Sequence, residues 1–224
     1  MKIPHLSFLL ALIIAGSFAC KSREQKDNAV TEKTEVVENK SETTETTREV
    51  VSSAAVVEIK SGNDVVASLR PGGQEVEISF GGSTLKGHLK GEKCKYELDG
   101  KLVAEVKYSD DGFKVRTPEG NLLWKIKIYD DKIKISDNEE NNNPFEIRES
   151  NSEKIKVKRE DREVATARLD GNKIEIESND ESLKFSVGGT LLQKAYAVAA
   201  IREIPERERW IIMHELLKKN PAGN

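Results

Sequence analysis

The feature that most constrains the fold is a strict alternation of charged and aliphatic residues over short segments. Five segments show it without interruption: Glu75–Ile78, Lys125–Ile128, Lys132–Ile135, Lys154–Val157 and Lys173–Ile176. Successive side chains of an extended chain point to opposite faces, so each segment has one apolar and one charged face. Strands with one wet face are typical of antiparallel sheets. The pattern therefore predicts a mainly β, antiparallel fold.

Turn-forming residues separate these segments at intervals of about ten residues. They occur at Gly62-Asn63-Asp64, Pro71-Gly72-Gly73, Gly81-Gly82, Asp99-Gly100, Asp111-Gly112, Glu119-Gly120, Asp130-Asp131 and Asp170-Gly171. Residues Asp99–Lys107 recur in similar form as Glu119–Lys127, which is the offset of one hairpin. Consecutive hairpins predict a meander of about a dozen strands, which has to close into a barrel or roll, or split into a sandwich.

The last part of the chain changes from strand to helix periodicity. Residues Leu191–Ile201 are apolar nearly all round, with Lys194 as the only charge, so we expect a helix over 190–203 that is buried inside the protein. Pro205 then opens a second, amphipathic helix that places Trp210 on its apolar face together with Ile211, Met213 and Leu217. The expected fold is a barrel or roll closed around the first helix, with the second helix at its end.

The N-terminus has the order of a secretory signal peptide. Lys2 precedes an apolar run from Leu6 to Ala15, which is too short to span a bilayer and leads to small residues before Cys20. We therefore interpret residues 1–19 as a signal peptide. Cleavage by an ordinary signal peptidase at Ser17-Phe18-Ala19 would release a soluble secreted or periplasmic protein.

The stretch Ser17-Phe18-Ala19-Cys20 resembles the bacterial lipobox, although the usual residue three before the cysteine is Leu and this chain has Ser17. The resemblance implies that Cys20 is the site of lipid attachment and that the protein is anchored in the cell envelope. Lys21 directly after the cysteine favours the outer membrane, if the host has one, by the same resemblance.

Between the anchor and the predicted barrel lies a polar segment. Residues 20–53 are rich in Glu, Lys, Thr and Ser and contain no aromatic residue, which predicts a disordered spacer or, less simply, a segment that folds on binding. The resulting organisation is a signal peptide (1–19), an anchor and linker (20–53), a β domain (54–204), and a C-terminal amphipathic helix with its tail (205–224).

The charged strands, the stretch Gly120–Lys127 and the apolar C-terminal helix together look like the tubby-like and phospholipid-scramblase-like β-roll superfamily. The resemblance covers about Val56 to Ile204. It implies a closed barrel around one buried helix, and either binding of phospholipid head groups or a scaffold role. This chain departs from the family in having a second helix after Pro205 and an export signal. No functional residue of the family can be assigned to a position in this chain.

Composition and motifs narrow the class of function. The formal net charge is −3 with 33% charged residues, which argues against nucleic acid as a partner. His5, His88 and His214 are too scattered for a metal site, and Cys94 alternates with lysines as a small inward-facing hydrophobe. No nucleophile motif or phosphate-binding glycine loop is present, so we expect no enzyme activity and no cofactor.

Two hypotheses for function remain. In the first, a lipid-anchored module binds anionic phospholipid or another envelope component through the barrel mouth or through a basic stripe formed by Lys125, Lys127, Lys132, Lys134, Lys154, Lys156 and Lys158. The stripe could equally belong to a mixed solvated surface that discourages pairing between strand edges. In the second, a structural or assembly lipoprotein docks a protein partner through the C-terminal helix that carries Trp210.

Overall fold

The computed structural model describes residues 55–72 and 75–219. These residues form fourteen strands, one 3-10 helix and one α-helix. In chain order the strands are β1 (Val57–Ser61), β2 (Asp64–Arg70), β3 (Glu75–Phe80), β4 (Ser83–Lys90), β5 (Lys93–Leu98), β6 (Lys101–Ser109), β7 (Gly112–Arg116), β8 (Leu122–Ile128), β9 (Lys132–Ser136), β10 (Phe145–Asn151), β11 (Lys154–Arg159), β12 (Arg162–Asp170), β13 (Lys173–Ser178) and β14 (Lys184–Gly188).

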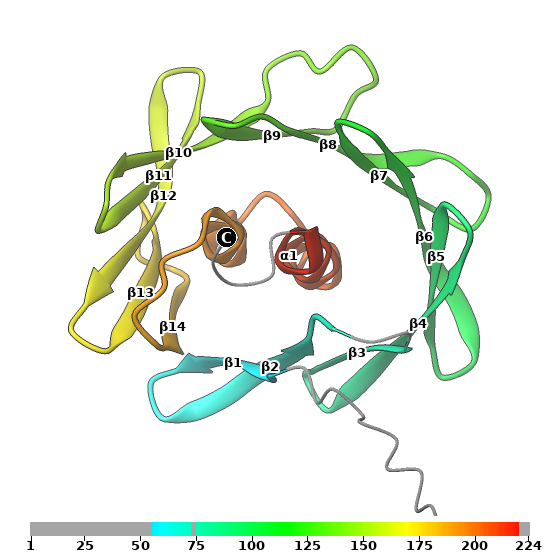
Figure 1. Ribbon diagram of the computed structural model, residues 1–224, viewed down its shortest axis with the longest axis horizontal. Helices are drawn as coiled ribbons and strands as arrows, with labels where there is room; N and C mark the ends of the chain where they lie inside the picture. The colour runs from blue at the N-terminus through cyan, green and yellow to red at the C-terminus, as the bar shows by residue number, and fades with distance from the viewer. Residues whose placement is uncertain (1–54, 73–74, 220–224) are drawn as a thin grey trace, which may run out of the picture. The chain divides into compact units, whose positions relative to one another are not determined.

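The strands make one closed antiparallel barrel. Each strand pairs with its neighbours in sequence, and β1 closes the ring by pairing with β14, with Ile59 opposite Val187 and Lys60 opposite Ser186 (Figure 1). The predicted antiparallel barrel is thus confirmed and the sandwich alternative is wrong. Closure leaves no strand edge unpaired, which explains how so long a meander avoids pairing with other chains.

The alternating residues of each strand point to the two sides of the barrel wall. Aliphatic positions such as Ile78, Ile126 and Ile135 are buried within the barrel, while the charged residues between them face outward. Cys94 is fully buried in the same inward row, as predicted.

The interior of the barrel is filled by the C-terminal part of the chain. The 3-10 helix η1 (Lys194–Ala200) and the α-helix α1 (Glu206–Lys219) both lie inside the ring of strands (Figure 1). Acidic residues in the first turn of α1 and lysines in its last turn match the dipole of the helix.

The first helix differs from its prediction in type and in extent. It begins at Lys194 and not near residue 190, and Leu191 is 45% exposed. Its hydrogen bonds span three residues, as between Tyr196 N and Gln193 O at 3.1 Å, and the segment turns to extended backbone at Ile201. A short helix without a side-chain cap readily tightens to this form. Its residues Ala195–Ala200 are buried, as the apolar sequence predicts.

The second helix differs from its prediction in location. The expectation of an exposed docking face is wrong, because the whole run Glu208–Leu217 is buried and Trp210 has no exposed surface. Trp210 packs edge-to-face against Phe185 of β14, with 5.8 Å between ring centroids. A barrel of fourteen strands has an interior wide enough for a second helix, whereas an eight-stranded barrel is filled by its own side chains. Neither described helix is long and apolar enough to cross a membrane.

Candidate functional site

The barrel interior contains a group of polar side chains that the sequence analysis did not single out. Glu215 of α1 accepts hydrogen bonds from the Tyr96 hydroxyl at 2.5 Å and from the Tyr108 hydroxyl at 2.7 Å. The neighbouring His214 lies with Nε2 3.0 Å from the carbonyl oxygen of Arg70 and with Nδ1 3.2 Å from the Tyr96 hydroxyl. Because a carbonyl oxygen only accepts, Nε2 carries the ring proton.

These interactions tie α1 to strands β2, β5 and β6. Burial lowers the pKa of His214, while the adjacent Glu215 carboxylate opposes that shift. Tyr96, His214 and Glu215 are all closed to solvent, so a ligand does not reach them in this structure. We interpret the group as a buried polar network that holds the helix in one register. His214 and Glu215 interrupt an apolar run in the sequence, which is the signal that could have identified them.

The outer surface of the barrel is strongly asymmetric in charge. Each of the six strands from β4 to β9 carries two Lys or Arg residues, and the acidic residues on these strands are limited to Glu97 and Glu105. Five of the other strands mix the two signs (β1, β2, β10, β12 and β13), and β3 carries only acids. Strand β11 is also basic, with three Lys and one Arg, but it stands between the mixed strands β10 and β12, and β14 carries a single Lys. Strands β4–β9 follow one another along the barrel wall (Figure 1), so their outer side forms one continuous surface, which we call the basic face.

The register of the strands places five lysines in a single row across this face. Lys90 lies opposite Lys93, Lys93 opposite Lys107, Lys107 opposite Lys114, and Lys114 opposite Lys125. Adjacent strands are about 4.8 Å apart, so the row extends roughly 20 Å around the barrel. Like charges directly opposite each other destabilise a sheet, so this arrangement works against the fold.

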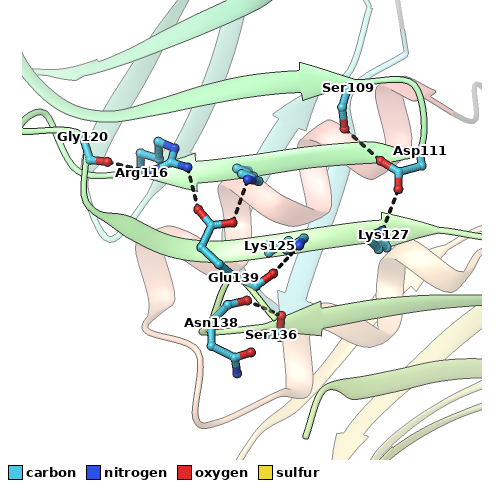
Figure 2. Close-up of polar contacts among 10 residues, drawn as sticks. Ser109, Asp111, Arg116, Gly120, Lys125, Lys127, Ser136, Asn138 and Glu139 are labelled. Carbon is cyan, nitrogen blue, oxygen red and sulfur yellow. Dashed lines mark hydrogen bonds and ion pairs between the residues drawn. The ribbon is translucent and has the colours of Figure 1, made fainter. Parts of the chain in front are cut away.

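Acidic residues neutralise one part of the basic face more than the other. On β7–β9, Lys127 pairs with Asp111 at 2.9 Å, Lys134 pairs with Glu146 at 2.9 Å, and Glu139 lies between Lys114 and Arg116 (Figure 2). On β4–β6, Lys93 pairs with Glu105 at 2.8 Å. The remaining five lysines of β4–β6 have no ion pair among the described residues: Lys86, Lys90, Lys95, Lys101 and Lys107.

The structure places only some lysines of the expected basic stripe next to one another. Its β8 and β9 members, Lys125, Lys127, Lys132 and Lys134, belong to the basic face. Its β11 members are separated from them by β10, which carries Glu146 and Glu149. The lysines of β4–β7 were not part of the expected stripe, because their alignment depends on strand register.

The mouth of the barrel is a second candidate surface for lipid. A pocket of about 660 Å³ lies there, lined mainly by apolar side chains that include Val57, Leu191 and Leu217. Its two charged residues, Glu58 and Lys60, are 3.6 Å apart and offset each other. The mouth therefore lacks the concentration of charge found on the basic face.

Among the described residues, no cluster of three or more His, Cys, Asp or Glu side chains is arranged to hold a metal ion. The predicted signal peptide, the anchor Cys20 and the linker lie outside the described residues. Comparison with protein families, with curated proteins and with solved structures finds no match for this chain.

Proposed function

We propose that this chain is a non-enzymatic lipoprotein of the bacterial envelope, attached through Cys20, whose barrel binds anionic phospholipid head groups with its basic face. The observation that carries the proposal is the row Lys90, Lys93, Lys107, Lys114 and Lys125 on five adjacent strands. The anchor and its outer-membrane location belong to the proposal through the lipobox resemblance.

A surface required only for solubility would favour alternating signs. The same barrel has such a row, in which Arg70 faces Glu77, Glu77 faces Lys86, and Lys86 faces Glu97. Cross-strand pairs of opposite charge stabilise a sheet, whereas like pairs cost stability. The lysine row is therefore better explained by an external anion than by the needs of the fold.

A phospholipid surface fits this row better than other polyanions do. The predicted export and anchoring would place the barrel beside a membrane and away from nucleic acid. Each Lys close to an anionic bilayer contributes about 1 kcal/mol, so several together give useful affinity without a deep pocket. The strongest part of the face is β4–β6, where five of the six lysines have no ion pair within the described residues.

The test uses residues 20–224 with Cys20→Ser, so that no acyl chain attaches the protein to the bilayer. Binding to phosphatidylcholine vesicles with and without phosphatidylglycerol is measured by flotation. We expect binding only to the anionic vesicles, and we expect it to weaken as salt is raised. Replacing Lys90 and Lys107 by Gln is expected to weaken binding about 30-fold, from about 1 kcal/mol for each charge.

A matched control removes the same number of charges elsewhere. Lys154 and Lys158 lie on β11, where Lys158 faces Glu146 on one side and Glu163 on the other. Replacing both by Gln should leave vesicle binding almost unchanged. Equal losses in the two double variants, or no preference for anionic vesicles in the parent protein, would contradict the proposal.

A further inference from the structure

Three cations of the basic face converge on one residue, Glu139. Glu139, in the loop between β9 and β10, accepts from Lys114 Nζ at 2.7 Å through Oε2 and from Arg116 Nη2 at 2.8 Å through Oε1 (Figure 2). Lys125 Nζ donates to the backbone carbonyl oxygen of the same residue. Lys114 and Arg116 lie on β7 and Lys125 lies on β8, so the three donors are positioned by the barrel wall.

One of the three cations, Arg116, is also held by a partner other than Glu139. Arg116 Nη1 donates to the carbonyl oxygen of Gly120 at 2.8 Å, which fixes the guanidinium against the turn between β7 and β8. Lys114 and Lys125 lie directly opposite each other, which keeps two like charges side by side. Positive charges concentrated in this way attract an anion to the site.

The loop that carries Glu139 has its own internal structure. The Asn138 side chain donates to Asn142 O at 2.9 Å and accepts from Asn142 N at 2.7 Å. Ser136 Oγ donates to Asn138 O at 3.1 Å. The hydrogen bond from Lys114, followed by that from Arg116, lowers the pKa of Glu139, so the carboxylate is ionised at neutral pH.

We propose that Lys114, Arg116 and Lys125 form a phosphate-binding site, which Glu139 fills in the free protein and leaves when the phosphate of an anionic head group binds. This inference rests on the proposed function and identifies where on the basic face one head group is held. Glu139 acts as a built-in competitor, so the loop sets the affinity of the site.

The chemistry of the two anions favours the exchange. The carboxylate contacts two of the cations, and the third bonds only the loop backbone. A phosphate has enough acceptor oxygens for all three donors, and Arg binds it in a bidentate manner. The Glu139 side chain is 44% exposed, and exposed ion pairs hold their partners weakly.

The experiment compares Glu139→Gln with Glu140→Gln in residues 20–224 carrying Cys20→Ser. Both substitutions remove one negative charge from the same loop, but Glu140 has no ion pair among the described residues. We expect Glu139→Gln to bind phosphatidylglycerol vesicles about fivefold more tightly, because it releases Lys114 and Arg116 from their exposed ion pairs with this carboxylate. Glu140→Gln should change the affinity much less.

A second titration separates the site from the membrane. Inorganic phosphate is added without vesicles, and the guanidinium signal of Arg116 is followed by NMR. Tighter phosphate binding by Glu139→Gln than by Glu140→Gln supports the site even if no variant binds vesicles, in which case only the proposed function fails. A gain with vesicles alone also supports it and assigns the site to head groups at a bilayer. Equal behaviour of the two variants in both titrations overturns the inference.

Discussion

The ionisable side chains inside the barrel couple its stability to alkaline pH. Burial raises the pKa of Cys94 from its ordinary value of 9.0 to about 11. Burial, together with the Glu215 carboxylate, also raises the pKa of Tyr96 well above 10.0. The folded protein therefore holds these protons more tightly than the unfolded chain does. The contribution of Cys94 to stability is complete below pH 9 and is lost as the pH rises from 9 to 11, and the contribution of Tyr96 is lost only from pH 10 upward.

The upward shift of the Cys94 pKa predicts how stability changes at alkaline pH. The free energy of unfolding, measured by urea titration, should fall above pH 9 by about 1.4 kcal/mol per pH unit for this thiol alone. Cys94→Ala, made in the Cys20→Ser chain, should delay the fall until about pH 10, where the tyrosines begin to ionise in the unfolded chain. An alkaline slope identical in both proteins would show that the thiol is not protected by the barrel.

At the scale of elements, the strands could be predicted and the position of the last helix could not. Alternation such as Lys132-Ile133-Lys134-Ile135 specifies a strand and its inner face directly. Helix α1 has no such clear pattern, because Glu208, Arg209, His214 and Glu215 are polar and yet buried. A helix with that composition is ordinarily expected at a surface. Its burial depends on partners such as Tyr96 and Tyr108, which lie more than 100 positions earlier in the chain.

Substitutions in the 3-10 helix η1 test whether this helix lies inside the barrel. Ala197 and Ala199 are fully buried, so an Asp at either position would place an unpaired charge in the interior. We expect Ala197→Asp and Ala199→Asp to lower the free energy of unfolding by at least about 3 kcal/mol. Thermal and urea unfolding measure this change.

Leu191 provides the matched control for these variants. It lies just before η1 and is 45% exposed, so Leu191→Asp should alter stability by no more than about 0.5 kcal/mol. If Ala197→Asp were as stable as Leu191→Asp, η1 would not lie inside the barrel.

At the scale of the whole molecule, the interior of the barrel and its basic face depend on different properties of the sequence. Its closed interior is determined by residue type, because each apolar position in a strand has only one face to occupy. Its basic face is determined by register: the row from Lys90 to Lys125 exists only because four hairpins align correctly. A slip of one residue in any of them would break the row. The sequence shows many lysines, and only the folded barrel shows which of them are neighbours.

The proposed anchor at Cys20 would bring this face to a membrane, and it can be tested by mass spectrometry. If Cys20 is the attachment site, protein extracted from membranes should have the mass of residues 20–224 plus two or three acyl chains. Cys20→Ser should lose that added mass and leave the membrane fraction. Salt washing serves as the control, because it releases protein held by lysines alone but not protein held by acyl chains. An unacylated wild-type chain would contradict the anchor. Cys94 is fully buried, so an unacylated Cys20 would not pair with it while the barrel is folded, and thiol titration of the native, reduced protein would detect Cys20.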